Sequence, residues 1–560
     1  MPSNRRQVIQ SAAAGAGLAI SGSVAVVSRV DARQTPASSG SIDNLRIAMS
    51  GLPPQLDPQT DTFIVMVRVY NMMFDTLIRR DWPNGGALVP GLATSWAQVD
   101  ESTLELALRP GVTFQDGSPF TANDVKFTFD RTIQGDARLA ASGRYGITET
   151  VVIDDLTVRL ITDGPRGSLL LLLTDPGAEI VPATYFQQVG YEAFQQMPLG
   201  TGPYRVTEFV PDTRIRFAAH TGYWGGAPAA ANVEVVPIPE VSTRIAALQN
   251  DEIDMAMDLP PDQIAELEGS GEFAISTVAP LNVNILAIVG ANPPMDRKEV
   301  RQALNLSIDR QTIVEQLLGG FGEWPTGLQS TLDPLYTERP QLPYDPDRAR
   351  ELLTTAGYAG EEIRLAFDSP NYYPLEQEWT EVVVSGWADV GLNVAMSPIE
   401  LNQREAITAQ DDWHLYTASS GNVADVALAQ VYATPTAEYQ ILHTPGQFDV
   451  LNSLVAQAQQ TVDKAQRRDL TRQALDVLED FVMVIPLFTI NRNTASKPTI
   501  SFQETPRFGV DLRPGRFTVS GRGRPIERNP LFYAWTISHR ALRAEMDRNA
   551  RRVPRDQGGK

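Results

Sequence analysis

Hydrophobic and polar residues alternate over a short stretch near residue 100, and this alternation predicts paired strands. Leucine occupies every second position of residues 104–108, so one face of this segment is apolar, as in a strand that covers a core. The alternation returns at Val112 and Phe114 after a Pro-Gly break. Residues 115–119 contain a second break with Asp, Gly, Ser and Pro. The pattern therefore predicts strand, turn, strand and turn.

A helix is predicted directly after this second turn. Thr121 is placed to cap it, and Asp124 stands three residues later, where a capping box needs an acid. Phe120 and Val125 have the spacing of a hydrophobic staple, and Phe129 shares a helical face with Val125. Local signals alone thus fix where this helix begins.

Other apolar patterns predict strands and helices throughout the chain. Asp309 and Asp345 stand where helix caps are expected, and Pro346 suits a first helical position. A strand, a helix and a strand between residues 363 and 396 have the order of a right-handed parallel crossover. The predicted elements are strands at 45–49, 151–160 (a hairpin), 204–209, 233–238, 363–367, 392–396 and 482–490, and helices at 63–78, 169–173 (a buried turn), 297–306, 309–319, 345 onward, 376–390 and, as one long helix, about 451–479.

Charge is unevenly distributed along the 560 residues, and the distribution disfavours several classes of partner. The chain has 47 basic and 67 acidic side chains, a net charge of −20. Residues 1–33 and 516–560 are basic, so the body between them is more acidic than the net charge suggests. An acidic body repels nucleic acid and anionic lipid, so neither is expected as its partner. The length allows two or three domains with cores of their own.

The sequence contains few residues whose type and spacing are typical of a catalytic or metal-binding site. There is no cysteine, which excludes disulfides, thiolate metal sites, cysteine nucleophiles and a lipid anchor attached through cysteine. The four histidines share no spacing typical of a metal site. No serine-hydrolase, zinc-protease or phosphate-loop motif is present. We therefore expect no enzyme activity, no metal and no cofactor.

The two ends of the chain have compositions unlike the body. Arg5 and Arg6 precede a weakly apolar stretch rich in Ala and Gly, which favours a twin-arginine signal peptide over residues 1–33; an ordinary secretory signal is the alternative. Residues 34–41 form a Ser/Pro/Gly-containing spacer. We expect an exported, periplasmic or extracytoplasmic protein. The basic tail at 516–560 has a weakly amphipathic pattern, for which docking on the acidic body or disorder is favoured over membrane contact.

The stretch from residue 88 to 131 also resembles a known family. Its strings at 92–96, 108–112, 116–120 and 124–125 match, at family spacing, the signature region of family 5 extracellular solute-binding proteins, the peptide- and nickel-binding receptors of ABC importers. Further similar strings occur at 200–204, 244–256 and 300–310. The resemblance extends over about residues 43–515.

The resemblance implies an α/β fold of the bilobed periplasmic-binding-protein kind, type II, of the large cluster with an extra subdomain in the first lobe. Such proteins close on their ligand by moving two lobes together. The tail from residue 516 has no counterpart in the family. The implied division is lobe I at 42–290 with a subdomain inserted at roughly 88–200, lobe II at 291–490, and a return to lobe I at 491–515.

The segment at residues 413–425 is the expected ligand site, because an apolar strand runs there into Ser, Ser, Gly and Asn. This order places hydrogen-bonding groups at a strand end, where open α/β sheets bind ligands. Related peptide receptors carry an Asp that pairs with the peptide's amino group. Asn422 takes that place here and supplies no counter-charge for a buried ammonium. The candidate residues are Tyr416, Thr417, Ala418, Ser419, Ser420, Asn422 and Asp425.

Aromatic residues in loops are further candidates for the walls of this site. Trp324 follows a glycine turn, and Tyr372 and Tyr373 lie in a loop flanked by proline. Asn284 is a weaker candidate. The alternative is that residues 419–425 form only a capped turn, with no role in ligand binding.

Together these features predict an exported receptor that captures an oligopeptide-like solute and delivers it to an ABC permease of the inner membrane, and we expect it to be monomeric. Asn422 and the aromatic loops leave an oligosaccharide or another non-peptide solute open as the ligand. Two further classes stay open: an exported hydrolase on the same scaffold, and a surface interaction protein that acts through its basic tail.

Overall fold

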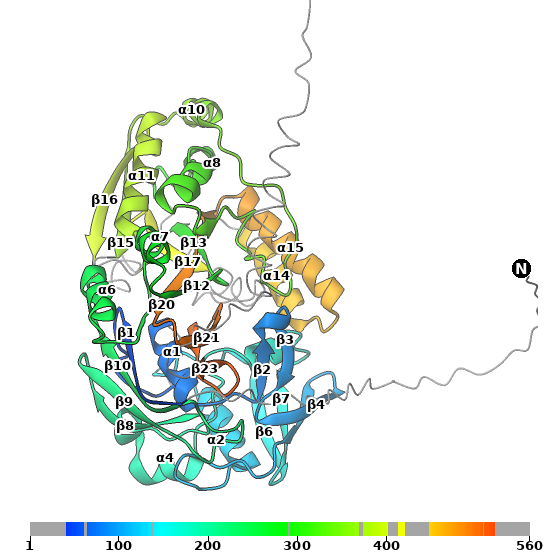
Figure 1. Cartoon of the computed structure of the whole chain (residues 1–560). Coiled ribbons are helices and arrows are strands. Elements are labelled where there is room, and N and C mark those ends of the chain that lie inside the picture. The colour runs from blue at the N-terminus through cyan, green and yellow to red at the C-terminus, as the bar shows by residue number, and fades with distance from the viewer. Residues whose placement is uncertain are drawn as a thin grey trace, which may run out of the picture. The chain divides into compact units, whose positions relative to one another are not determined.

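The computed structural model describes residues 41–60, 64–135, 138–288, 292–368, 373–400, 413–420, 447–507 and 509–520. Within these ranges most strands belong to three larger sheets of seven, five and four strands (Figure 1). Each larger sheet has its own buried apolar side chains. The candidate residues expected on the strand near 413–420 belong to the five-stranded sheet.

The seven-stranded sheet has the order β12-β20-β11-β1-β10-β9-β8. Its central strand β1 is parallel to both β10 and β11, and α6 (Val241–Gln249) connects these two neighbours. Leu45, Ile47 and Met49 are fully buried, so the predicted alternation identified the core face of β1. The strands are β1 (Ile42–Met49), β8 (Tyr204–Val210), β9 (Arg214–Ala219), β10 (Ala230–Pro237), β11 (Met255–Ala256), β12 (Ala274–Val278) and β20 (Arg492–Ser496).

The four-stranded sheet is antiparallel, with the order β4-β5-β7-β6, and α2 (Ala122–Ile133) packs against it. The predicted capping box is confirmed, because the Asp124 carboxylate accepts from the Thr121 backbone N–H at 2.9 Å. The predicted second strand at Val112 and Phe114 is wrong: a single bridge between Thr113 and Pro119 holds this turn. The strands are β4 (Ala93–Asp100), β5 (Thr103–Leu108), β6 (Ile147–Asp154) and β7 (Thr157–Thr162).

Helix α1 (Ile64–Met73) is shorter than the predicted helix at 63–78. The Met73 carbonyl accepts from the Gly202 backbone N–H at 2.9 Å and from the Gln115 side chain at 2.8 Å, so distant partners replace the next helical turn. The chain then enters β2 (Ile78–Asp81), which pairs with β3 (Ala87–Pro90). Apolar spacing could not indicate this early end, because the competing hydrogen bonds come from another part of the chain.

The five-stranded sheet has the order β16-β15-β17-β13-β18. Strand β15 is parallel to β16 and to β17, which confirms the predicted parallel pairing across α11 (Glu376–Asp389), whereas β13 is antiparallel to β17 and β18. In Figure 1, α11 lies alongside β15 and β16. The strands are β13 (Val283–Ile288), β15 (Glu362–Asp368), β16 (Asn393–Ile399), β17 (Leu415–Ser420) and β18 (Val484–Pro486).

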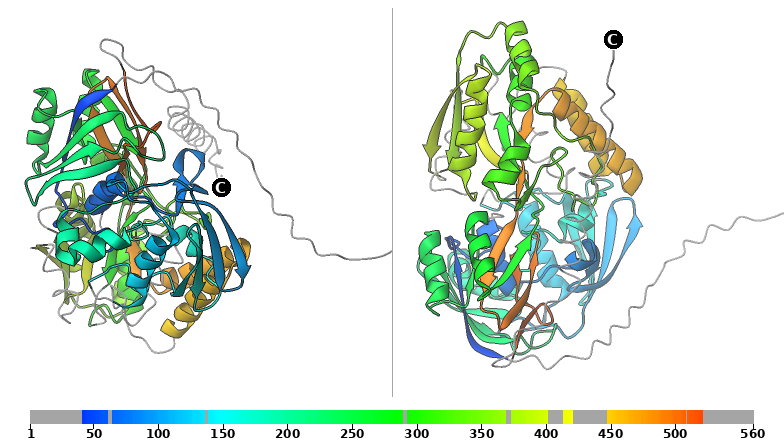
Figure 2. Two further views of the ribbon diagram at one scale, coloured as in Figure 1. Left: turned by 90° about the horizontal axis from the view of Figure 1, so that it is seen from below. Right: turned by 45° about the horizontal axis from the view of Figure 1, so that its top comes forward.

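Two antiparallel helices replace the single long helix predicted at 451–479, and they lie side by side in both views of Figure 2. Helix α14 (Gln447–Gln460) ends, and the Asp463 side chain then caps α15 (Lys464–Asp480) by accepting from the Gln466 N–H at 2.8 Å. The Gln459 carbonyl accepts instead from the N–H of Gly167, beyond β7. The prediction of one helix failed because its apolar spacing continues through the break.

The remaining described helices flank these sheets or join them. Asp309 and Asp345 cap their helices as predicted, each accepting from a backbone N–H at 2.9 Å. Helix α6 begins after Glu240, whose side chain does not cap it. These helices are α3 (Leu169–Leu172), α4 (Ala183–Val189), α5 (Tyr191–Gln196), α7 (Pro261–Ser270), α8 (Lys298–Leu306), α9 (Arg310–Thr312), continued by one π-type turn (Ile313–Leu317), and α10 (Pro346–Thr355).

A small three-stranded sheet, β22-β21-β23, ends the described part of the chain. Strand β23 (Phe517–Val519) pairs with β21 (Ile500–Thr505), and the buried Phe517 side chain joins the core beside the seven-stranded sheet. The first residues of the range assigned to the basic tail therefore belong to the fold, and residues 521–560 lie outside the described ones. Strand β22 comprises Gly509–Asp511.

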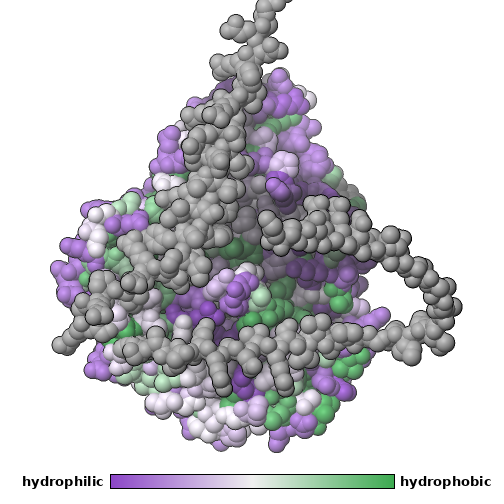
Figure 3. All heavy atoms as spheres, turned by 45° about the vertical axis from the view of Figure 1, so that its right-hand side comes forward, coloured by the Kyte–Doolittle hydropathy of each residue, from purple (hydrophilic) through white to green (hydrophobic). Residues whose placement is uncertain are grey.

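Hydrophobic and hydrophilic residues are interspersed on the face of the molecule shown in Figure 3. The large apolar side chains that are exposed come from separate elements, such as Val99 in β4, Val382 in α11 and Val450 in α14. Among the described residues, no helix is long and apolar enough to cross a membrane.

Candidate functional site

The end of β17 is where the structure gathers the described candidate residues. Because β15 and β17 are parallel, their carboxyl ends meet at one edge of the five-stranded sheet. The amino end of the antiparallel β13 reaches the same edge, where Asn284 is paired with Ser419 in the register of the two strands. The sequence alone did not indicate this neighbour, because β13 and β17 are far apart in the chain.

A buried carboxylate, that of Glu376, holds this edge together. It accepts from the backbone N–H groups of Asp368 at 3.1 Å and Tyr373 at 3.0 Å, and from the Thr417 hydroxyl at 2.5 Å. Burial raises the pKa of Glu376 to about 7, with Asp368 raising it further, although the three donors act against this shift. One side chain at the start of α11 thereby connects β15, β17 and the loop that contains Tyr373.

Three of the candidate residues support the sheet edge rather than line a surface. Tyr416, Thr417 and Ala418 are fully buried. The Tyr416 hydroxyl donates to both carboxylate oxygens of Asp368 at 2.8 and 2.9 Å. Their contribution is to fix the position of the strand end.

Ser419 is the half-buried residue of this group, and the Tyr373 hydroxyl donates to its Oγ at 3.2 Å. The structure thus brings together a candidate at the end of β17 and a candidate from the loop before α11. Ser420 and Asn284 are buried, at 5% and 3% exposure. Tyr372, Asn422 and Asp425 lie outside the described residues.

Trp324 follows β14 (Gly322–Glu323), which pairs with β19 (Thr489–Ile490), and it packs against the core of the five-stranded sheet. Its indole N–H is buried and has no hydrogen-bond partner among the described residues. A buried donor without a partner is uncommon in folded proteins. Trp324 therefore keeps a free hydrogen-bonding group near this core.

A loop that sequence reasoning did not single out connects the β17 edge to the four-stranded sheet. The Ser420 hydroxyl donates to the Leu328 carbonyl at 3.1 Å. A few residues later, Leu335 is fully buried in the core of the four-stranded sheet. The loop's buried apolar ends are therefore fixed in two different cores, which positions it between the two regions.

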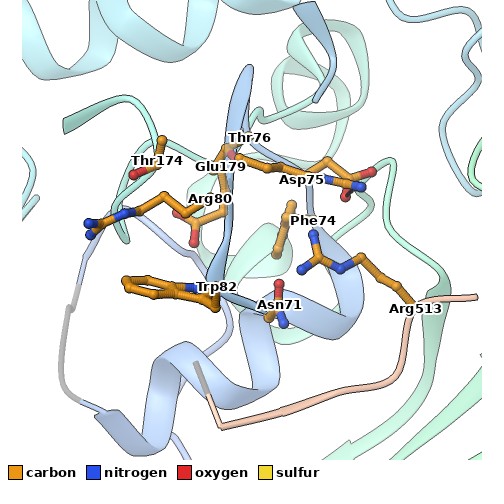
Figure 4. A pocket seen from close by; sticks show the side chains of 10 residues that line it. Asn71, Phe74, Asp75, Thr76, Arg80, Trp82, Thr174, Glu179 and Arg513 are labelled. Carbon is orange, nitrogen blue, oxygen red and sulfur yellow. Dashed lines mark hydrogen bonds and ion pairs between the residues drawn. The ribbon is translucent and has the colours of Figure 1, made fainter. Parts of the chain in front are cut away.

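A pocket that the sequence did not indicate lies at the end of α1 and along β2 (Figure 4). Most of its charged groups are paired. Asp75 pairs with Arg79 and also accepts from Trp224 Nε1 at 2.7 Å, and Arg513 pairs with Asp511 at 2.6 Å. The residues that line it are Asn71, Phe74, Asp75, Thr76, Arg79, Arg80, Trp82, Thr174, Glu179 and Arg513.

The described residues contain no group of three or more His, Asp or Glu side chains that could hold a metal ion. The chain offers no cysteine ligand either. Besides the carboxylates of Glu376 and Asp368, which are hydrogen-bonded within the fold, the polar groups at the β17 edge are hydroxyls, amides and backbone groups, which suit hydrogen bonding to an organic solute.

The fold is that of the α/β periplasmic binding proteins. Residues 87–438 match the model of the family "Bacterial extracellular solute-binding proteins, family 5 Middle". The chain belongs to the bacterial extracellular solute-binding proteins of family 5. The resemblance of its signature region is thereby confirmed, as is the expected fold class.

Relatives and solved structures agree with this membership. The chain is 30% identical over 406 residues to the glutathione-binding protein GsiB of Pectobacterium atrosepticum, which covers 70% of this chain and 78% of the relative. The structure matches the periplasmic binding protein DppA from Helicobacter pylori, in complex with the peptide STSA, with a TM-score of 0.75 and 20% identity, over 86% of this chain and 99% of that one. A dipeptide-binding protein from Pseudoalteromonas, in complex with Met-Leu, matches with a TM-score of 0.75 and 24% identity, over 85% and 100%.

Proposed function

We propose that this protein is an exported receptor that captures an oligopeptide-like solute between two lobes and delivers it to an ABC permease. Family membership gives the class of solute-binding protein, and relatives that bind glutathione or peptides support a peptide-like ligand. The observation that carries the placement of the site is the β17 edge, where Ser419, Tyr373 and Asn284 converge at the carboxyl ends of parallel strands.

Binding by lobe closure follows from the same proposal. A ligand shifts such a protein to its closed state only if it binds that state more tightly. Ser419 and Tyr373 would contribute backbone and hydroxyl groups from the second lobe, and residues of the first lobe would complete the contacts. The expected lobe boundaries and the twin-arginine export route belong to this proposal as well.

A second candidate ligand is an oligosaccharide or another neutral solute. Trp324 favours it, because its indole N–H has no partner among the described residues and its ring suits stacking against a sugar. Asn422 favours it too, because an amide supplies no counter-charge for a ligand ammonium.

A ligand panel with two variants tests the proposal and separates the candidates. We expect tripeptides or glutathione, but not maltotriose, to raise the melting temperature of the purified mature protein, because a ligand of the native state stabilises it by mass action. Asn422→Ala should weaken binding by about 1–3 kcal/mol, the range for loss of a buried polar partner. Asn422→Asp should preserve or strengthen binding of a cationic amine and weaken binding of a neutral sugar.

The panel also contains the results that would contradict the proposal. Stabilisation by maltotriose alone would replace the peptide ligand with a sugar. If both Asn422 variants bind the ligand as tightly as the wild type, residues 413–425 do not form the site.

A further inference from the structure

Arg492, the first residue of β20, is an arginine whose side chain makes no hydrogen bond or ion pair among the described residues. Its Nη1 is buried and has no hydrogen-bond partner. No carboxylate oxygen in the described part of the chain lies within the 4.0 Å of an ion pair with it. The residue is half-buried, so part of its surface stays open to a solute. A guanidinium has five N–H donors, and buried donors are seldom left without an acceptor.

Two carboxylates, those of Glu504 and Asp258, attract the charge of Arg492 without contacting it. Asp258 is already paired with Arg68 at 2.5 Å and accepts from the Ser50 hydroxyl at 3.1 Å. Glu504 accepts from hydroxyl groups of β20 and β12. Burial raises the pKa of Glu504 to about 7, so this side chain is partly protonated at neutral pH. Both acids are therefore engaged elsewhere in the fold.

The surroundings of Arg492 disfavour its charge. Burial lowers the pKa of Arg492 to about 9, and the charges of Arg68 and Arg507 lower it further, against the attraction of the two carboxylates. Arg507 shares one carboxylate, that of Asp175, with Arg144, at 3.7 and 2.9 Å. Arg492 remains a cation at neutral pH, because its pKa lies above 7. An anion in contact with the guanidinium would offset the cost of burying this charge.

Arg492 lies at the edge of the seven-stranded sheet where parallel strands of that sheet end. Strand β20 is antiparallel to β11, with Ala495 opposite Ala256, the last residue of β11. Arg492 precedes Ala495 in β20, so it lies beyond the carboxyl end of β11, which is parallel to β1. Open α/β sheets bind ligands at this edge. The seven-stranded sheet thus has a cation at the same kind of edge where the five-stranded sheet has the hydroxyls of β17.

A short connection joins the edge at Arg492 to the β17 edge. Arg492 is paired with Val278, the last residue of β12, and Asn284 of β13 is paired with Ser419. Asn284 comes six positions after Val278. An extended chain covers at most about 3.5 Å per residue, so the Cα atoms of Val278 and Asn284 lie at most about 21 Å apart. Side chains from the two edges and a short peptide can together span this distance.

We propose that Arg492 binds a carboxylate of the transported solute, which makes the solute an acid or a zwitterion. The planar guanidinium can donate two parallel hydrogen bonds to a carboxylate. This role of Arg492 rests on the proposed function and adds to it the chemical class of the solute. It agrees with Asn422, which supplies no counter-charge for an ammonium, because recognition then depends on the acidic end of the solute. The carboxylate belongs either to a peptide or to a sugar acid.

Acetate is the probe that tests the site directly. Its binding to the purified mature protein is measured by calorimetry and by melting-temperature shifts, with acetamide as the neutral control and chloride at equal ionic strength. We expect saturable binding of acetate to the wild type and at least tenfold weaker binding to Arg492→Gln. Arg348→Gln, the same change at an exposed position of α10, should bind acetate like the wild type.

The melting temperature without ligand separates this role from a structural one. Arg492→Gln should melt at the temperature of the wild type or above it, because the variant loses a cation that has no partner among the described residues. Marked destabilisation of Arg492→Gln, with acetate bound as tightly as by the wild type, would assign Arg492 a structural role and overturn the inference.

Paired probes identify the source of the carboxylate. If it belongs to a peptide, trialanine binds the wild type at least tenfold more tightly than its C-terminal amide does, and Arg492→Gln removes this preference. The same preference for trigalacturonate over maltotriose, without binding of trialanine, would assign the carboxylate to a sugar acid and contradict the peptide ligand of the proposed function. Tight and equal binding of trialanine and its amide would overturn the role of Arg492 and leave the proposed function intact. Equal binding of acetate by the wild type and by Arg492→Gln, or no saturable binding at all, would also overturn it.

Discussion

Glu376 and Glu179 experience the same burial, but their surroundings give them different roles. Burial raises the pKa of each side chain to about 7. Among the described residues, Glu376 accepts from donors in three separate segments, whereas Glu179 accepts from the backbone N–H groups of Gly177 and of Glu179 itself. A carboxylate that accepts from several distant segments connects them, whereas one that accepts only from its own turn does not. The origin of the donors, more than the extent of burial, therefore distinguishes the two side chains.

The largest change in the free energy of unfolding is expected when Glu376 is replaced with alanine. The change leaves the N–H groups of Asp368 and Tyr373 and the hydroxyl of Thr417 without their acceptor in a buried site. Each orphaned group costs about 1–3 kcal/mol, and we expect a total loss of about 3 kcal/mol in the free energy of unfolding. Urea denaturation measures it, with the exposed Glu381→Ala as control. A loss below about 1 kcal/mol would contradict the structural role of Glu376.

The pH dependence of stability should identify Glu376 as a proton-binding group. Its folded-state pKa of about 7 lies above the ordinary 4.5, so the folded chain holds the proton more tightly than the unfolded chain. The contribution is complete below about pH 4.5 and is lost as the pH rises through 7. One pKa unit corresponds to about 1.4 kcal/mol, so stability relative to Glu376→Gln should fall by about 2–3 kcal/mol between pH 5 and 8. A difference that is constant with pH would refute this.

Glu179→Gln should have the opposite sign from Glu376→Ala at pH 8. Burial raises the pKa of Glu179 to about 7, so at pH 8 the side chain is charged at a cost in stability, and the amide oxygen of Gln can accept from the Gly177 N–H in its place. We expect the free energy of unfolding to rise by about 1 kcal/mol without ligand, within the cost range for a buried polar group that is poorly paired. Denaturation at pH 8 provides the measurement. Marked destabilisation would assign Glu179 the structural role of Glu376.

The smallest loss in the free energy of unfolding is expected at Tyr373, whose backbone N–H donates to Glu376. Tyr373→Phe removes the hydroxyl that donates to Ser419 but preserves the backbone N–H that donates to Glu376. A single hydrogen bond of a half-buried pair contributes about 0.5–1.5 kcal/mol, and the lower end applies here. Denaturation measures the loss, and titration with the ligand of the panel shows whether the Tyr373–Ser419 pair lies at the site. A loss above about 2 kcal/mol would place Tyr373 among the structural residues.

Several features of the fold followed from the sequence because their causes are local. The Thr121–Asp124 capping box and the caps at Asp309 and Asp345 depend on hydrogen bonds between residues three apart. The alternation in β1 identified its buried face, and the order of strand, helix and strand predicted the parallel pairing of β15 and β16. Where the sequence prediction failed, at Met73 and near Asp463, residues distant in the chain take the hydrogen bonds of a helix end.

Of the candidate site, the sequence by itself determined that the strand at 415–420 ends in polar residues, and motif resemblance determined the family. Only the tertiary structure paired Asn284 with Ser419, placed Glu376 against Thr417 at a separation of 41 residues, and left Glu179 facing a pocket beside Trp82. Capping and alternation depend on near neighbours, which a sequence shows directly. Whether a buried carboxylate accepts from distant segments or only from its own turn depends on which segments pack around it, and that is decided only when the chain folds.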